Sequence, residues 1–241
     1  MAINLKKLQA IARRRLKLKD PVEWEKVSKS QLKNQGLGSE YLSTRSSINK
    51  HVISYSDASS LEAVDVFHEM CKAKLNELGF NTIEAAALDA MRDCGKDDPK
   101  YIRDANSAAA IVLETLANSI LFSLFPEESR AQRERMVLRF ESTDALTTLH
   151  TQMEFWGTAG VSYYLEASNR SGTPFPQNLV EKAITRASDG QEIRKEYDAI
   201  NSLLEELPKI DFDLERIPDD DSLKIVDVMV RLFAAKTGLE C

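Results

Sequence analysis

The sequence predicts a mostly helical protein: an α+β fold with at most a small two-stranded ribbon, built on a bundle-like helical body with a basic N-terminal arm. The chain has only 9 Gly and 7 Pro among 241 residues and 7% aromatic residues. These counts disfavour β-sandwiches and barrels, which need frequent turns. A 43% hydrophobic share in a chain of this length is enough to bury a core, which excludes global disorder.

Helical periodicity and capping residues recur along the chain and predict its helices. Ser59 and Glu62 form a capping box before a run of apolar residues at helical spacing, and Gly79 marks the end of that helix. Asp98 and Pro99 begin a long helix whose apolar surface widens toward its end. Helices are expected at residues 3–18, 59–78, 82–94, 99–124, from 126 onward, 143–168, 177–188, 191–207 and 222–236.

Two short segments are the candidates for strands. Residues 136–141 (MVLRFE) alternate between apolar and polar side chains, as a half-buried strand does. Residues 51–56 (HVISYS) are the plausible partner for such a strand. Together they would form the expected ribbon.

Charge divides the chain into a basic arm and linker at residues 1–50 and a helical body at residues 51–241. Residues 1–19 contain seven Lys or Arg and no acid, whereas the whole chain has a net charge of −6. Residues 36–39 and 43–47, rich in Gly, Ser and Thr, are typical of a linker. Within the body, residues 205–221 carry eight acids and two bases and form an acidic connector.

Cysteine use and hydropathy predict an intracellular, cytoplasmic protein. Cys71, Cys94 and Cys241 are odd in number and widely spaced, which fits neither a disulfide framework nor a Cys-based zinc site. We expect Cys71 and Cys94 to be buried thiols inside helices. The N-terminus lacks the pattern of a secretory signal, and residues 108–125 contain Glu114 and Asn118, so we expect a buried helix and no membrane partner.

No motif predicts catalysis, so we expect a protein that is not an enzyme and holds neither cofactor nor metal. His68-Glu69 matches the start of a zinc-protease helix motif, but the second histidine is missing. His68 and Cys71 share a helix face, but a structural zinc needs four ligands. Gly157-x-x-Gly160 lacks the Lys-Ser/Thr of a phosphate-binding loop.

The arm is the feature that points to a function. If residues 3–18 are helical, Leu5, Leu8, Ala12 and Leu16 form an apolar stripe and the bases lie on the other side. Three interpretations remain: binding to nucleic-acid phosphates, binding to a membrane surface, and docking on the acidic body of the same or a neighbouring subunit. The absence of Trp and Phe before Trp24 weakens the membrane interpretation.

We expect non-catalytic binding to single-stranded nucleic acid, DNA more than RNA, with little sequence specificity. A flexible strand can follow a basic track and stack on aromatic side chains, whereas a stiff duplex would bring its phosphates close to the acidic body. No motif suited to a duplex major groove is present. The candidate binding residues are Lys6, Lys7, Arg13, Arg14, Arg15, Lys17, Lys19, Trp24, Lys26, Lys29 and Lys33.

The runner-up hypothesis is a structural assembly protein whose arm and acidic connector bind neighbouring copies. Both hypotheses predict a homo-oligomer. Under the first, the connector at residues 205–221 would compete with nucleic acid for the arm or recruit a basic partner protein.

Overall fold

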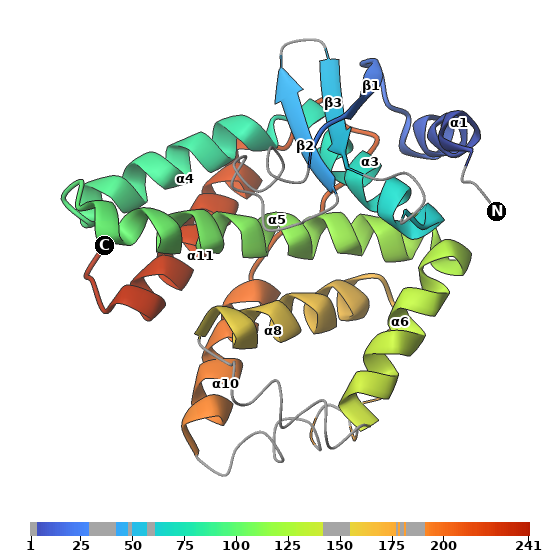
Figure 1. The fold of residues 1–241 in the computed structure, drawn as a ribbon. Helices are drawn as coiled ribbons and strands as arrows, with labels where there is room; N and C mark the ends of the chain where they lie inside the picture. The colour runs from blue at the N-terminus through green and yellow to red at the C-terminus, as the bar shows by residue number, and fades with distance from the viewer. Residues whose placement is uncertain are drawn as a thin grey trace.

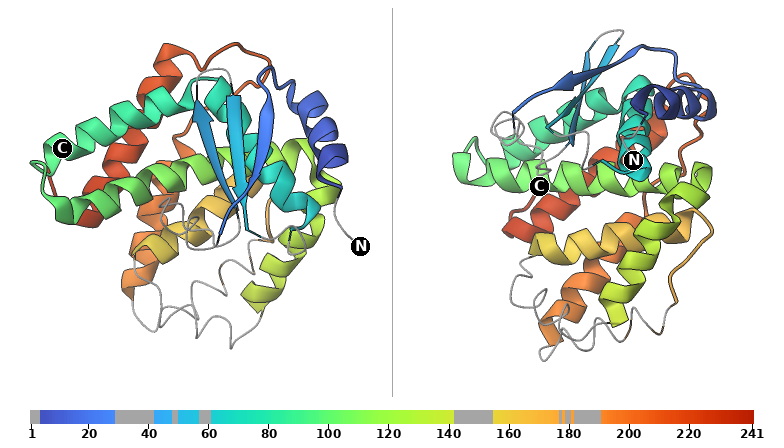
Figure 2. Two further views of the ribbon diagram at one scale, coloured as in Figure 1. Left: turned by 45° about the horizontal axis from the view of Figure 1, so that its top comes forward. Right: turned by 45° about the vertical axis from the view of Figure 1, so that its right-hand side comes forward.

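The computed structural model describes residues 4–28, 42–47, 50–56, 61–141, 155–176, 178, 181 and 191–241. It confirms a mostly helical fold with one small sheet (Figure 1). The N-terminal helix and the sheet lie on one side of a long central helix, and the later helices lie on the other sides (Figure 2).

The N-terminal part consists of one helix and three strands. Helix α1 (Leu5–Leu16) is followed by β1 (Val22–Lys26), β2 (Leu42–Ser47) and β3 (Lys50–Tyr55). The strand order is β1-β3-β2, with β1 parallel and β2 antiparallel to β3. Strand β3 is therefore central and holds β1, next to the basic helix, in the sheet.

The strands differ in part from the sequence prediction. Residues 51–56 do contribute a strand, but its antiparallel partner β2 (Leu42–Ser47) contains residues 43–47, which were expected to be linker. Residues 136–141 are not a strand, because they continue helix α6 (Pro126–Glu141) without a break. Glu127 and Glu128 in the first turn favour that helix through its dipole, and the alternating end of the segment does not stop it.

The described helices of the body occur in the predicted order, whereas most of the helix predicted at residues 177–188 and the first part of the one predicted at 143–168 lie outside the described residues. Asp98 accepts a hydrogen bond from the Lys100 backbone N–H at 3.0 Å, at the start of the turn that leads into the central helix. The Asp65 carboxylate accepts a hydrogen bond from the Glu62 backbone N–H at 2.7 Å and caps the helix that begins at Ala63. The elements are α3 (Ala63–Glu77), α4 (Phe80–Cys94), the 3₁₀ turn η2 (Pro99–Tyr101), α5 (Ile102–Leu124), α6, α8 (Phe155–Arg170), α10 (Gln191–Glu205) and α11 (Asp219–Thr237).

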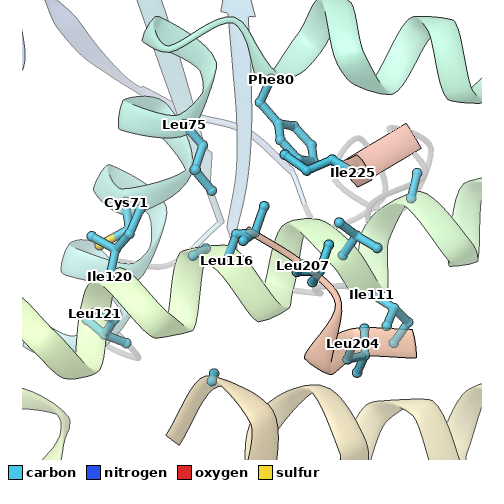
Figure 3. Close-up of a cluster of buried hydrophobic side chains, with 14 of the residues drawn as sticks. Cys71, Leu75, Phe80, Ile111, Leu116, Ile120, Leu121, Leu204, Leu207 and Ile225 are labelled. Atoms are coloured by element: carbon cyan, nitrogen blue, oxygen red, sulfur yellow. The ribbon is translucent and has the colours of Figure 1, made fainter. Parts of the chain in front are cut away.

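Helix α5 is the centre of the core. It packs against α3, α4, α8 and α11, and the close-up in Figure 3 shows apolar side chains from both sides of it. Leu116 and Ile120 on α5 are almost completely buried, as are Leu75 on α3 and Leu204 on α10. Phe67 stacks on Phe125 with ring centroids 4.5 Å apart.

By length and composition, the described helix over Pro99–Leu124 is apolar enough to cross a membrane. In the structure, 61% of its most apolar window is buried by the rest of the chain. The helix is surrounded by other helices of the same chain, as expected from the polar side chains within it.

The cysteines correct one expectation. Cys71 is a buried free thiol, as predicted. Cys94, however, is only half-buried at the last residue of α4 and forms a disulfide with Cys241, with the two Cα atoms 5.3 Å apart. The partners are 147 residues apart, and packing of α11 on α4 brings the C-terminus to this position.

The disulfide predicts the number of reactive thiols. Protein unfolded in guanidinium without reductant should react with one equivalent of a thiol reagent, from Cys71 alone, and with three equivalents after reduction. Three equivalents before reduction would contradict the pairing of Cys94 with Cys241.

Candidate functional site

Helix α1 is docked on the body by its apolar face. Ala12 is 0% exposed and Leu16 is 1% exposed, and the helix packs against α3. At its N-terminus, the Asn4 side chain accepts a hydrogen bond from the Lys7 N–H at 3.1 Å. The arm is therefore part of the folded structure, and its apolar stripe is used within the chain.

Arg15 fixes the basic side of α1 to the junction between α5 and α6. Its Nη1 lies 3.2 Å from Glu128 Oε1 and donates to the Leu124 carbonyl at 3.1 Å. Its guanidinium also lies over the Phe125 ring, 5.2 Å from the centroid. Arg15, one of the predicted nucleic-acid ligands, is thus engaged by the chain itself.

Two further bases contact the acidic connector. Lys17 Nζ lies 2.7 Å from Asp213 Oδ1, and Lys19 Nζ lies 3.3 Å from Glu215 Oε1. The Lys17 and Asp213 side chains are 65% and 66% exposed, so water screens the pair. The connector therefore lies beside the basic arm, although 196 residues separate the members of each pair.

Three further bases of α1 face solvent. Lys6, Lys7 and Arg14 are exposed and form no ion pair with any residue that the structure describes. Lys7 and Arg14 are seven residues apart, so they lie on one helix face about 10 Å from each other. Arg13 is half-buried and donates to the Lys19 carbonyl at 3.2 Å. We call Lys6, Lys7 and Arg14 the outer basic strip.

Among the predicted binding residues that follow Lys19, Trp24 and Lys26 lie in the described part of the chain. Trp24 is half-buried, donates from Nε1 to Gln9 Oε1 at 3.1 Å and meets the edge of Tyr55, so it acts as a packing residue between α1 and β3. Lys26 is exposed at the end of β1. Lys29 and Lys33 lie outside the described residues.

A buried carboxylate ties the end of the arm to α3. Glu77 Oε1 accepts hydrogen bonds from the backbone N–H groups of Lys19, at 2.9 Å, and Asp20, at 2.7 Å. Burial alone would raise the pKa of Glu77, but hydrogen bonding with His51 and Asp20 outweighs it and lowers that pKa. Glu77 is therefore a charged anchor for the turn between α1 and β1.

The residues around Glu77 include three side chains of the kinds that bind metal ions. Asp20, His51 and Glu77 bring ligand atoms within 4.8 Å of one another. However, one Glu77 oxygen already accepts two backbone hydrogen bonds, and Lys74 Nζ lies 3.6 Å from the other. A buried ammonium at that distance opposes a divalent cation. The arrangement fits a structural junction better than a metal centre.

Sequence reasoning missed a charged network between α3 and α5. Glu114 Oε2 lies 2.9 Å from His68 Nε2, and Glu114 Oε1 lies 2.6 Å from Lys72 Nζ. Glu69 Oε1 lies 3.3 Å from His68 Nδ1 and 3.2 Å from Lys72 Nζ. The i, i+4 spacing of His68 and Lys72 on one helix face was a visible signal, but their partner Glu114 comes from another helix.

The network shifts the protonation of its members. Burial alone would lower the pKa of His68, but the charge of Glu114 outweighs it and raises that pKa to about 9. Burial alone would raise the pKa of Glu114, but Lys72 and His68 lower it. Burial and the charge of Glu114 raise the pKa of Tyr163. His68 is therefore positively charged at neutral pH and stabilises the contact of α3 with α5.

Burial of Leu16 predicts a large effect on stability. Leu16→Ala should lower the free energy of unfolding by about 3 kcal/mol, because it removes a buried side chain and leaves a cavity between α1 and α3. Urea unfolding followed by circular dichroism measures this change. Leu223→Ala, at a residue 68% exposed, is the matched control and should change stability by less than about 0.5 kcal/mol. Equal effects of the two variants would contradict the docking of α1.

The charged network predicts a loss of stability in alkali. Because the pKa of His68 is raised on folding, its contribution is complete below pH 6.5 and is lost as the pH rises through about 9. Between pH 6 and pH 10 the wild-type protein should lose about 3 kcal/mol more stability than His68→Gln. Urea titrations across this range test it, and parallel curves for the two proteins would contradict it.

The comparisons with known proteins found no relative. No protein-family model matches this chain, and neither a curated protein nor a solved structure matches it. The outer basic strip, the ion pairs of α1 with the body and the charged network between α3 and α5 are the features from which a function can be inferred.

Proposed function

We propose that this chain is a non-catalytic protein that binds single-stranded nucleic acid through backbone phosphates on the outer face of α1. The observation that carries the proposal is the outer basic strip. Lys6, Lys7 and Arg14 keep their charges in solvent after the apolar face of the helix is buried. Each Lys or Arg that neutralises a phosphate releases a counterion from the strand, and this supplies affinity without sequence preference.

The helix suits this role because it is held rigidly at the opposite face. Leu16, Arg15 and the anchor at Glu77 hold α1 on the body, so binding requires no folding of the arm. A surface with a few phosphate contacts gives modest affinity that depends strongly on salt. The contribution of base stacking is small, since Trp24 is engaged in packing.

The runner-up, a structural assembly protein, is favoured by a different observation. Arg15, Lys17 and Lys19 already pair with acids of the body, so the basic arm and the acidic surface are complementary. The same complementarity between two copies would hold an assembly together. Light scattering across a salt series distinguishes the two, because assembly through these charges would be lost at high salt without nucleic acid.

The proposed interface predicts the salt dependence of binding. Fluorescence anisotropy with a labelled single-stranded oligonucleotide should give a linear log–log plot of affinity against salt, with a slope of about −0.7 per phosphate contact. Lys7→Ala with Arg14→Ala should make the slope shallower by about 1.4, because two contacts are removed.

The matched control removes one Lys in the 3₁₀ turn η2 and one Arg in the first turn of α5, and this end of α5 lies far from α1 in Figure 1. Lys100→Ala with Arg103→Ala changes the net charge equally and should leave the slope unchanged. If the two double variants change the slope alike, the interface does not lie on α1. If the wild-type protein does not bind at about 50 mM salt, nucleic acid is not its ligand and the assembly hypothesis takes its place.

A further inference from the structure

The acidic connector contains a loop that is fixed at both ends and presents its acids to the basic helix. Leu207 and Ile217 are each 4% exposed, and the Ile217 N–H donates to the Leu78 carbonyl at 2.9 Å at the end of α3. At the other end, Arg170 Nη1 on α8 donates to the Leu207 carbonyl at 2.9 Å. Between these anchors, residues 209–216 run past α3 toward α1, as the orange segment in Figure 2 shows.

The tip of this loop brings two carboxylates into contact with the two lysines that follow α1. Asp213 contacts Lys17 and Glu215 contacts Lys19, while Leu214 between them is 40% exposed. The turn is shaped by Asp211, whose carboxylate accepts a hydrogen bond from the Asp213 N–H at 2.9 Å. The spacing of Asp213 and Glu215 therefore matches that of Lys17 and Lys19, two residues apart in each segment.

We propose that the loop at residues 209–216 is a built-in competitor, which occupies Lys17 and Lys19 and withholds them from the phosphates of a bound strand. This inference rests on the proposed function. The carboxylates occupy the positions that phosphates would take beside these lysines. The outer basic strip stays accessible, so the loop limits the interface to Lys6, Lys7 and Arg14 without closing it.

The weakness of the two ion pairs makes the loop a reversible competitor. All four side chains are at least 65% exposed, and Glu215 is 90% exposed, so each pair contributes little to stability. The apolar anchors at Leu207 and Ile217 hold the loop near the arm independently of these pairs. Neutralising the acids should therefore free the lysines and leave the fold intact.

The test removes the negative charges of Asp213 and Glu215 in the full chain. In Asp213→Asn with Glu215→Gln, binding of a labelled single-stranded oligonucleotide at about 50 mM salt should tighten by roughly tenfold, and the log–log salt slope should steepen by about 1.4. The charge-matched control is Asp89→Asn with Asp227→Asn, two exposed acids on α4 and α11. The control should leave the slope unchanged.

A second pair of variants shows whether the increase in affinity depends on Lys17 and Lys19. Lys17→Ala with Lys19→Ala should change binding little in the wild-type chain, because the loop already withholds these residues, and should abolish the gain in the Asp213→Asn, Glu215→Gln chain. Circular dichroism and the urea midpoint confirm that each variant is folded.

The outcomes separate this inference from the proposed function. If the wild-type chain binds and the neutralised chain has the affinity and slope of its control, the competitor is overturned and the proposed function stands. If neither chain binds, both fail. If only the neutralised chain binds, the loop competes for the arm as inferred, but the outer basic strip does not bind a strand in the wild-type chain and the proposed function fails.

Discussion

The burial of α5 is the constraint on which the other elements depend. The helix has 23 residues and is therefore about 34 Å long, with small or apolar side chains on every side. Such a helix is stable in water only when other elements cover most of its apolar surface, and α3, α4, α8 and α11 do so. Ala108, Ala109 and Ala117 of this helix are almost completely buried and let neighbouring helices approach closely.

The polar residues of α5 then decide where α3 lies. Thr115 donates from Oγ1 to the Ile111 carbonyl at 2.8 Å, which satisfies its hydroxyl within the helix. Glu114 Oε2 accepts a hydrogen bond from Asn118 Nδ2 at 3.3 Å within the helix, but this neutral donor leaves the buried negative charge without a cation, which would be costly. His68 and Lys72 on α3 provide the opposite charges, so Glu114 favours the observed register of α3 against α5. The position of α3 in turn brings its C-terminal residue, Glu77, into hydrogen-bond contact with the turn that follows α1.

Much of the helical fold was predictable from local patterns, and the exceptions have physical reasons. The helices ending at Cys94 and beginning near Pro99 are marked by glycine, proline and capping acids, which act over a few residues. Strand β2 was not predictable, because its Ser- and Thr-rich sequence forms a strand through pairing with β3 and not through a local preference. The end of α6 alternates like a strand, but it follows a well-formed helix start, and a helix once begun extends more easily than it stops.

The candidate site was predictable in composition but not in geometry. The sequence shows that α1 is basic and amphipathic, yet which bases are free depends on partners such as Glu128 and Asp213, more than 100 residues away along the chain. The disulfide between Cys94 and Cys241 likewise joins two residues that are far apart along the chain. Contacts of this kind form only after the intervening chain has packed, so their residue types carry no local signal.

The two faces of α1 carry different chemistry, because one is buried against the body and the other lies in solvent. A helix that must stay docked can offer a ligand only the residues on its outer side, and burial of Leu16 orients Arg14 and Lys7 outward as a geometric consequence. Bases at its C-terminal end experience the negative end of the helix dipole and nearby acids, which stabilises them where they are. Those near its N-terminal end, Lys6 and Lys7, have neither compensation. The free positive potential of the arm is therefore concentrated on the N-terminal and outer part of α1, and a polyanion gains most by approaching there.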